Sequence, residues 1–280
     1  MNSERFKSIV EFNKAHETEV ADNIRDFYLD FGIDSQSSIM NIEQVVRMEM
    51  EERRFIMISL PLKDKEIGAM AYKGDFWGYL FVNSTLPKVN VNFALCHELY
   101  HIHFQPDSFH NTVEIYIDEH YKDEESERMA NLFAGAVLMP KGQFSSMFDR
   151  LRKKGLDEVR IICHLMSYFC APYAAVLIRS YELGLMNEQG ESLKNLLQNG
   201  YEECIKEHFK ADWLDDSALR ASYRNDIFKL DALIDKIGAK EVRLGRMSEN
   251  SIKKIKANVK TIYSGLVEEY NGGETIEQGV

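Results

Sequence analysis

Two histidines four residues apart, His97 and His101, enclose Glu98 in an H-E-x-x-H motif. On a helix of about 3.6 residues per turn, positions four apart differ by about 40°, so both imidazoles can reach one metal ion. Glu98 points about 100° away from His97, beside the ion rather than at it. A general base is needed there to take a proton from a water held by the metal. The spacing therefore predicts a metal site with Glu98 as its catalytic base.

The motif lies in a run, residues 91–104, that otherwise reads as a buried helix. With eight histidines in 280 residues, chance alone gives such a motif in roughly one or two chains in a hundred. Taken alone, the motif also fits two histidines on a polar helix face. Histidine and glutamate in an apolar helix are costly, however, unless a partner such as a metal satisfies them. The apolar neighbours are Phe93, Ala94, Leu95, Leu99, Ile102 and Phe104.

A zinc site needs a third protein ligand and one open position. A second helix is expected from about residue 123 to residue 140, and Glu127 and Asn131 share one face of it. Ala134 continues that face with little bulk, which lets this helix approach the first. We favour Glu127 because Asn131 can then accept the free ring N–H of a metal-bound histidine. An acidic helix start can also serve the helix dipole. The rival ligands are Glu124, Glu125 and His120.

These two helices need a scaffold, and the sequence predicts one built from both strands and helices. Short strands are expected at about 55–60, 68–72 and 77–82, which together suggest a small antiparallel sheet. Residues 4–31 and 41–52 read as two helices with a break near residue 32. The expected fold class is therefore α+β, with the sheet packed on a two-helix metal site and an all-helical C-terminal domain following it.

At this point the sequence resembles a known family. His97-Glu98-Leu99-Tyr100-His101 is followed after twenty-five residues by Glu127-x-x-Ala130-Asn131-x-Phe133-Ala134 and by Leu138-Met139-Pro140. The linked motifs resemble the ImmA/IrrE family of metallo-endopeptidases. The resemblance covers roughly residues 41–187, and the pair of motifs is far more specific than H-E-x-x-H alone.

The resemblance implies a cytoplasmic zinc peptidase of gluzincin type. The metal ligands would be His97, His101 and Glu127, and the base would be Glu98. Members of the family typically act on helix-turn-helix transcriptional repressors and so relieve repression in mobile elements, phage or stress responses. Two positions depart from the family: Tyr100 stands where a small residue is usual, and Met129 where an acidic one is frequent.

Two alternatives follow from these features. The same scaffold could hold a metal and disable a repressor by sequestering it without hydrolysis, because the bulk of Tyr100 could crowd a substrate cleft. The protein could instead be a DNA-binding regulator. The native metal also stays open, because two histidines and one carboxylate can bind Mn²⁺, Fe²⁺ or Co²⁺ in place of Zn²⁺.

Residues 157–186 pair two helices in a way that resembles a helix-turn-helix, and Pro172 starts the second of them. That second helix carries only Arg179 as a cation, so we expect a packing or partner surface instead of a DNA reader. The polar stretch 187–191 reads as a boundary. We expect a metallopeptidase domain at 1–187, a helical C-terminal domain at 188–270 and a disordered tail at 271–280.

Composition limits the partners. The formal net charge of −11 argues against a nucleic-acid surface, which needs clustered lysine and arginine. The longest apolar run, residues 129–139, is too short to span a bilayer. Four cysteines without a C-x-x-C pair fit reduced thiols in a cytosol. We expect a cytoplasmic protein that acts on a protein substrate and contacts neither nucleic acid nor membrane directly.

Overall fold

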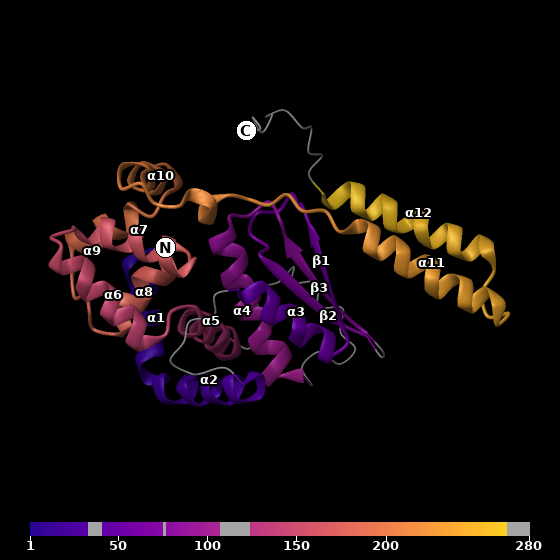
Figure 1. The fold of residues 1–280 in the computed structure, drawn as a ribbon, viewed down its shortest axis with the longest axis horizontal. Helices are drawn as coiled ribbons and strands as arrows, with labels where there is room; N and C mark the ends of the chain where they lie inside the picture. The colour runs from indigo at the N-terminus through magenta and orange to yellow at the C-terminus, as the bar shows by residue number, and fades with distance from the viewer. Residues whose placement is uncertain (33–40, 75–76, 107–123, 268–280) are drawn as a thin grey trace.

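The computed structural model describes residues 1–32, 41–74, 77–106 and 124–267 of the chain. These residues are mostly helical and include one three-stranded sheet at the centre of the molecule (Figure 1). Its strands are β1 (Phe55–Leu60), β2 (Ala69–Lys73) and β3 (Gly78–Asn83). The predicted α+β class is confirmed, whereas the predicted tail at 271–280 lies outside the described residues.

The sheet is mixed. The strand order is β1-β3-β2, with β3 parallel to β1 and antiparallel to β2, so antiparallel pairing was predicted correctly only for β2 and β3. The fully buried Asn83 at the end of β3 explains this order. Its side chain accepts the N–H of Leu62 and donates to the carbonyls of Asp64 and Ile67. These bonds carry the β1–β2 connection across the end of β3, which leaves β3 in the centre.

Both faces of the sheet are covered. Phe55 and Met57 of β1 join the main core beneath α3 (Ile42–Glu52), whereas Ile58 and Leu60 point to the opposite face and form a second apolar cluster with Val267. A strand buried on both faces needs apolar residues at nearly every position. This explains why β1 reads as an almost continuous apolar run instead of alternating.

The two predicted metal helices pack directly against each other. They are α4 (Lys88–Phe104) and α5 (Glu124–Leu138). Ala130 and Ala134 of α5 are fully buried, and small side chains at a helix contact allow the two backbones to come close. The approach of α5 to α4 brings the faces that carry the two motifs together.

The N-terminal segment forms two helices where the sequence predicted one at 4–31. They are α1 (Ser3–Ala15) and α2 (Glu17–Phe31), separated at His16, whose φ of −105° and ψ of 14° leave the helical region. The break lets α1 pack on α8 (Tyr173–Glu182) while α2 packs on α5. No glycine or proline marks this position, so the sequence carried no signal for it.

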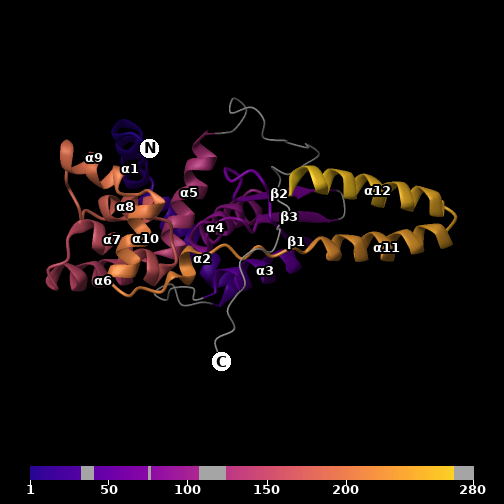
Figure 2. The same ribbon diagram turned by 90° about the horizontal axis from the view of Figure 1, so that it is seen from above.

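A helical layer occupies one end of the molecule (Figures 1 and 2). Besides α8 it contains α6 (Lys141–Lys153), α7 (Glu158–Phe169), α9 (Glu191–Gln198) and α10 (Glu202–Ala211). The boundary near residue 187 stays a prediction, although the main core continues across it. The buried residues that α9 and α10 add to this core are Leu193, Leu196, Ile205 and Phe209.

In the described part of the chain, no single helix is long and apolar enough to cross a membrane. Only α7 and α8 taken together reach that length and composition, and they are bent by 108° relative to each other. Arg179, the cation of α8, is buried and donates to the carbonyl of Met139. It therefore is not on the surface that a DNA-reading helix would present.

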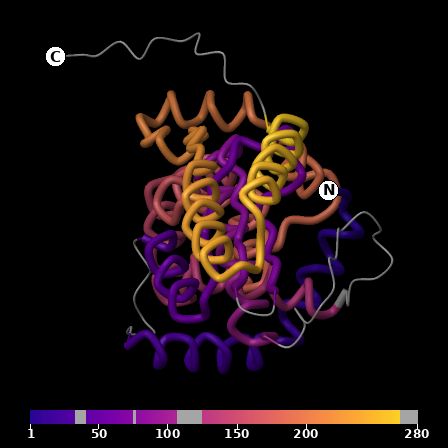
Figure 3. Tube along the Cα trace, turned by 90° about the vertical axis from the view of Figure 1, so that its right-hand side faces the viewer, coloured from indigo at the N-terminus to yellow at the C-terminus, as the bar shows by residue number. Residues whose placement is uncertain are grey.

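The C-terminal residues form a helical hairpin that projects from the sheet end of the molecule (Figures 1 to 3). After the short helix η2 (Asp216–Leu219), an extended segment at 220–226 leads to α11 (Ile227–Arg243) and α12 (Glu249–Leu266). Leu62 forms an isolated bridge with Val267, which returns the end of α12 to the sheet.

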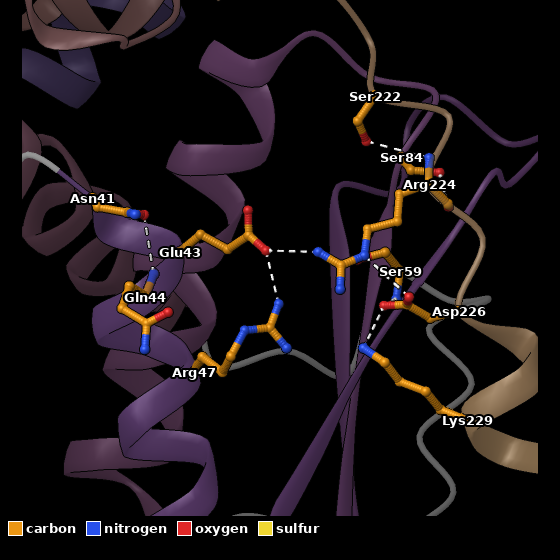
Figure 4. Close-up of polar contacts among 10 residues, drawn as sticks. All are labelled: Asn41, Glu43, Gln44, Arg47, Ser59, Ser84, Ser222, Arg224, Asp226 and Lys229. Atoms are coloured by element: carbon orange, nitrogen blue, oxygen red, sulfur yellow. Dashed lines mark hydrogen bonds and ion pairs between the residues drawn. The ribbon is translucent and has the colours of Figure 1, made fainter. Parts of the chain in front are cut away.

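Polar contacts fix the start of this hairpin to the body (Figure 4). The buried Asp226 carboxylate accepts the backbone N–H of Ser59, and it pairs with Arg224 and Lys229 at 3.0 and 2.9 Å. Arg224 also lies 3.3 Å from the carboxylate of Glu43 on α3. The base of the hairpin is thereby attached to β1 and α3, while its far end extends away from both.

Candidate metal centre

The helix α4 presents both motif histidines on one face. Leu95 and Leu99 bury the opposite face in the core, and His97 and His101 face Glu127 of α5. The Nε2 atoms of His97 and His101 lie 3.2 Å apart. This is the convergence that a four-residue spacing on a regular helix predicts.

Glu127 of α5 faces the two histidines. Its Oε2 lies 3.2 Å from Nε2 of His97, and its Oε1 lies 3.5 Å from Nε2 of His101. Zinc ligands about 2.0–2.1 Å from one ion at tetrahedral angles stand about 3.3 Å from one another. The three side chains offer ligand atoms that all lie within 4.8 Å of each other, so they could hold one ion.

The rival ligands are placed differently. Glu125 is exposed over 70% of its side chain and lies 3.7 Å from His16. His120 and the side chain of Glu124 lie outside the described residues. Among the side chains that are described, the group formed by His97, His101 and Glu127 is the one suited to a metal.

Each imidazole has an acceptor at its other ring nitrogen. Oδ1 of Asn131 lies 3.1 Å from Nδ1 of His97, and Oε1 of Gln105 lies 2.9 Å from Nδ1 of His101. Ser126 donates to the same Gln105 oxygen over 2.7 Å. The sequence interpretation did not identify Gln105 or Ser126 as partners of the candidate ligands. A signal existed, because Gln105 is four residues after His101 and Ser126 directly precedes Glu127.

These acceptors favour one tautomer of each ring. The side-chain carbonyls of Asn131 and Gln105 can accept a proton from Nδ1, and in that tautomer the Nε2 lone pairs of the two rings face each other. Two lone pairs and a carboxylate at this distance repel one another unless a cation or a proton lies among them. The donor set therefore fits a divalent metal ion, with outer acceptors of the kind that metal-bound histidines usually have.

The charges around the site act on His97. Burial lowers the pKa of His97, but hydrogen bonding to Glu127 and the charges of Glu98 and Glu127 together outweigh burial and raise that pKa. The negative field that attracts a proton to this imidazole attracts a metal cation in the same way.

Glu98 follows His97 on α4 and is half-buried. Its charge acts on His97, as the raised pKa shows, so its carboxylate belongs to the electrostatic surroundings of the centre. Tyr100 is buried, with 6% exposed. Its ring packs against Phe104 and Phe133 in the core and also meets the His101 ring in a T-shaped arrangement, 5.7 Å between centroids.

His103, the other histidine near the end of α4, is not part of the centre. Its Nδ1 lies 2.7 Å from Oε1 of Glu49 on α3, and its Nε2 lies 3.4 Å from Asp30 on α2. Arg53 also pairs with the buried Glu49 carboxylate. Burial raises the pKa of Glu49. The hydrogen bonds from His103 and Arg53 lower that pKa by a larger amount, so the net shift is downward. This cluster joins α2, α3 and α4 behind the candidate centre.

The family comparison covers the same elements. A family model described as the IrrE N-terminal-like domain (Peptidase_M78) matches residues 41–181, which is half of the chain. A search of the curated proteins finds no match. The matched stretch runs from the start of α3 into α8 and contains the whole candidate centre. The match to this family supports a metallopeptidase activity. Together with the group formed by His97, His101 and Glu127, it indicates that the protein binds a divalent metal. The chain belongs to the ImmA/IrrE family, whose members share the IrrE N-terminal-like domain.

Proposed function

We propose that this protein is a zinc-dependent endopeptidase that hydrolyses a peptide bond in a partner protein. The observation that carries the proposal is the convergence of three ligand atoms within 4.8 Å, from His97, His101 and Glu127. Zinc bound there would supply a Lewis acid that lowers the pKa of a water molecule toward about 7 and polarises a carbonyl group. Mn²⁺ or another divalent metal could take the same place.

The residues of the chain have separate tasks in this mechanism. Glu98 accepts the proton of the attacking water and passes it to the amine that leaves when the C–N bond breaks. Asn131 and Gln105 hold the two imidazoles with Nε2 toward the centre.

The substrate we propose is a helix-turn-helix transcriptional repressor, so that cleavage relieves repression. Support comes from the family resemblance and from charge. A DNA-binding protein carries lysine and arginine to neutralise phosphates, and a chain of net charge −11 attracts such a partner. We expect the enzyme to act in the cytoplasm, where such a repressor meets DNA.

The C-terminal hairpin provides a second proposed contact with this substrate. Residues 227–266 carry nine basic and four acidic side chains, opposite in sign to the chain as a whole. Large apolar side chains also remain exposed on the hairpin: Phe228, Ile237, Leu244, Ile255, Ile262 and Leu266. Exposed apolar side chains together with an excess of positive charge on a projecting element favour protein contact. We propose that the hairpin docks a neutral or acidic face of the substrate protein.

The sequestration alternative depended on Tyr100 crowding the cleft. Because the Tyr100 ring is buried against Phe104 and Phe133, its bulk gives no support to that alternative. The DNA-binding alternative gains none either, since Arg179 is buried and pairs with Glu182. Hydrolysis is the function that the geometry supports best.

The test compares two glutamate-to-glutamine variants. Glu98→Gln should keep one equivalent of zinc but slow cleavage of a degenerate peptide library by about 10²- to 10⁴-fold, because the amide cannot act as a base. Glu125→Gln is the matched control, since this exposed side chain lies on α5 outside the centre, and it should cleave like the unchanged protein. Zinc is measured by atomic emission and products by mass spectrometry.

Glu127→Gln completes the set and should lose zinc along with activity, since it removes one of the three ligands. Undiminished cleavage by Glu98→Gln would refute the assigned base. A purified protein that binds no divalent metal under any loading condition would refute both hydrolysis and the sequestration alternative.

A further inference from the structure

A cavity of about 280 Å³ opens beside the candidate centre, between α1, α4, α5 and α8. Its walls are mainly apolar, with Ile9 from α1, Phe93 from α4 and Ile178 from α8. Volumes near this value are at the small end for ligand pockets, so the cavity suits one large side chain better than a whole ligand. The remaining apolar lining includes Leu132, Gly135 and Ala175.

The cavity adjoins the centre directly. Phe93 lies one helical turn before His97 on the same face of α4. Asn131, which contacts Nδ1 of His97 at 3.1 Å, lines the cavity with its neighbours on α5. A group that occupies the cavity is therefore within one residue's reach of a peptide bond held at the centre.

The charged groups in the cavity wall already have partners within the protein. Arg179 and Glu182 form an ion pair, and Asn13 donates to the same Glu182 carboxylate over 2.6 Å. Arg128 donates to the carbonyl of Ser8 over 2.8 Å. A charged ligand would compete with these bonds, whereas an apolar side chain would leave them in place and bury only apolar surface.

We propose that this cavity is the specificity pocket of the peptidase, and that it selects a large apolar side chain next to the scissile bond. Leucine, methionine and phenylalanine are the residues it accepts. This assignment rests on the proposed function, because it names the substrate class for the same centre. The site therefore prefers cleavage beside apolar residues, which a folded repressor exposes only in a segment that opens or in an interface.

Gly135 offers a direct test. A Cβ built there meets only the end of Met139, at 4.0 Å, so a side chain fits without moving the backbone. Gly135→Leu adds an isobutyl group to the wall and fills the cavity. Gly265→Leu is the matched control for short peptides, which are too small to bridge the centre and the hairpin, because Gly265 is also a helical glycine, has nothing within 4 Å of a built Cβ, and does not line the cavity.

The experiment digests a degenerate peptide library with the zinc-loaded full-length protein, and mass spectrometry reads both residues that flank each cut. We expect at least about 10-fold preference for leucine, methionine or phenylalanine over alanine at one flank. Gly135→Leu should abolish this preference while peptides with alanine or glycine there are still cut. Gly265→Leu should leave the preference unchanged. Ile178→Ala, which enlarges the cavity, should shift the preference toward phenylalanine and tryptophan.

Two outcomes would overturn the assignment: cleavage of the library without apolar preference, or a preference that Gly135→Leu and Ile178→Ala both leave unchanged. A binding measurement separates this from failure of the proposed function. Fluorescent peptides that differ only by leucine or alanine are titrated onto Glu98→Gln protein with and without Gly135→Leu. If no peptide is cut, the proposed hydrolysis is wrong. The cavity assignment then holds only if the leucine peptide binds at least about 10-fold tighter than the alanine peptide, and if Gly135→Leu removes that difference.

Discussion

Side-chain carbonyls fix both imidazoles of the candidate centre. His97 is held from the facing helix by Asn131, and His101 is held from its own helix by Gln105. Ser126 donates to Gln105 and thereby links the start of α5 to the end of α4. An imidazole with a fixed Nδ1–H keeps its Nε2 lone pair directed at the metal position, so less ordering is needed when the ion binds.

Gln105→Ala should lower metal affinity by about 10- to 100-fold, because it frees the ring of His101 and leaves Nδ1–H without its acceptor. Titration of the zinc-loaded protein with a competing chelator measures this change. Gln198→Ala, an exposed glutamine at the end of α9, is the control and should bind zinc like the unchanged protein. Equal affinity in both variants would show that Gln105 does not orient His101.

Much of this centre could be anticipated from residue spacing. His97 and His101 are linked by the helical repeat alone, and the same repeat brings Glu127 and Asn131 to one face of α5. Gln105 obeys the same rule relative to His101, so its spacing was a usable signal, but an uncharged residue before a proline does not stand out as an outer partner of a metal ligand. What spacing cannot supply is the approach of α5 to α4, which depends on tertiary packing.

At the scale of elements, one buried amide decides the order of the strands. Asn83 is fully buried and bonds to Leu62, Asp64, Ile67 and Thr85. The strands themselves could be recognised from their apolar runs, but their order could not. It depends on where the β1–β2 connection crosses, and that is set by one side chain whose burial only the fold reveals.

Asn83→Ala should therefore destabilise the protein by about 3 kcal/mol or more, because several buried polar groups lose their partner at once. Urea unfolding followed by circular dichroism measures the free energy of unfolding. Asn90→Ala is the control, since Asn90 is exposed on α4 and the change should cost less than about 0.5 kcal/mol. A small effect of Asn83→Ala would mean that the crossing is held by other contacts.

The contact between α7 and α10 contains a charge cluster. Asp212, buried at the end of α10, pairs with Arg160 at 2.6 Å and with His164 at 3.1 Å. The bond from Arg160, with a smaller contribution from His164, lowers the pKa of Asp212 below its usual value. A lowered folded-state pKa stabilises the protein above the unfolded pKa of about 3.9, and this stability is lost as pH falls through the folded value.

Asp212→Asn should accordingly lower the free energy of unfolding at pH 7, where the carboxylate is charged. The difference from the unchanged protein should shrink as the pH falls below about 4, where the carboxylate takes up its proton. Denaturant unfolding at a series of pH values gives both curves. A difference that is the same at pH 3 and pH 7 would show that packing, and not the charge of Asp212, joins the two helices.

At the scale of the whole molecule, the two ends of the hairpin have different tasks. Its base covers the outer face of the sheet, where Ile227, Leu230 and Tyr263 pack on Ile58 and Leu60. Its far end extends away from the described part of the body (Figures 1 and 2). A truncation before α11 would expose the apolar face of the sheet, so it cannot test docking without damaging the fold.

Shortening the hairpin is the sharper experiment. Lys256 lies 2.9 Å from Asp235, which marks a level where the two helices face each other. Replacing residues 237–254 with a short glycine and serine linker keeps that pair and the base while it removes the far end. The shortened protein should stay folded, bind one equivalent of zinc and cut short peptides within about 2-fold of the full-length rate, because every group of the candidate centre lies outside the deletion.

Cleavage of a folded protein substrate should respond differently. If the hairpin docks the substrate, cleavage of a co-expressed helix-turn-helix repressor that the full-length protein cuts should fall at least about 10-fold, the loss of roughly 1.4 kcal/mol of contact. A truncation after Asp226 serves as the contrast. It should aggregate or lose solubility, since Ile58 and Leu60 would face water. Unchanged repressor cleavage by the shortened protein would leave the hairpin as a cover for the sheet and would place substrate choice in the body, whose negative charge then remains the main attraction for a basic partner.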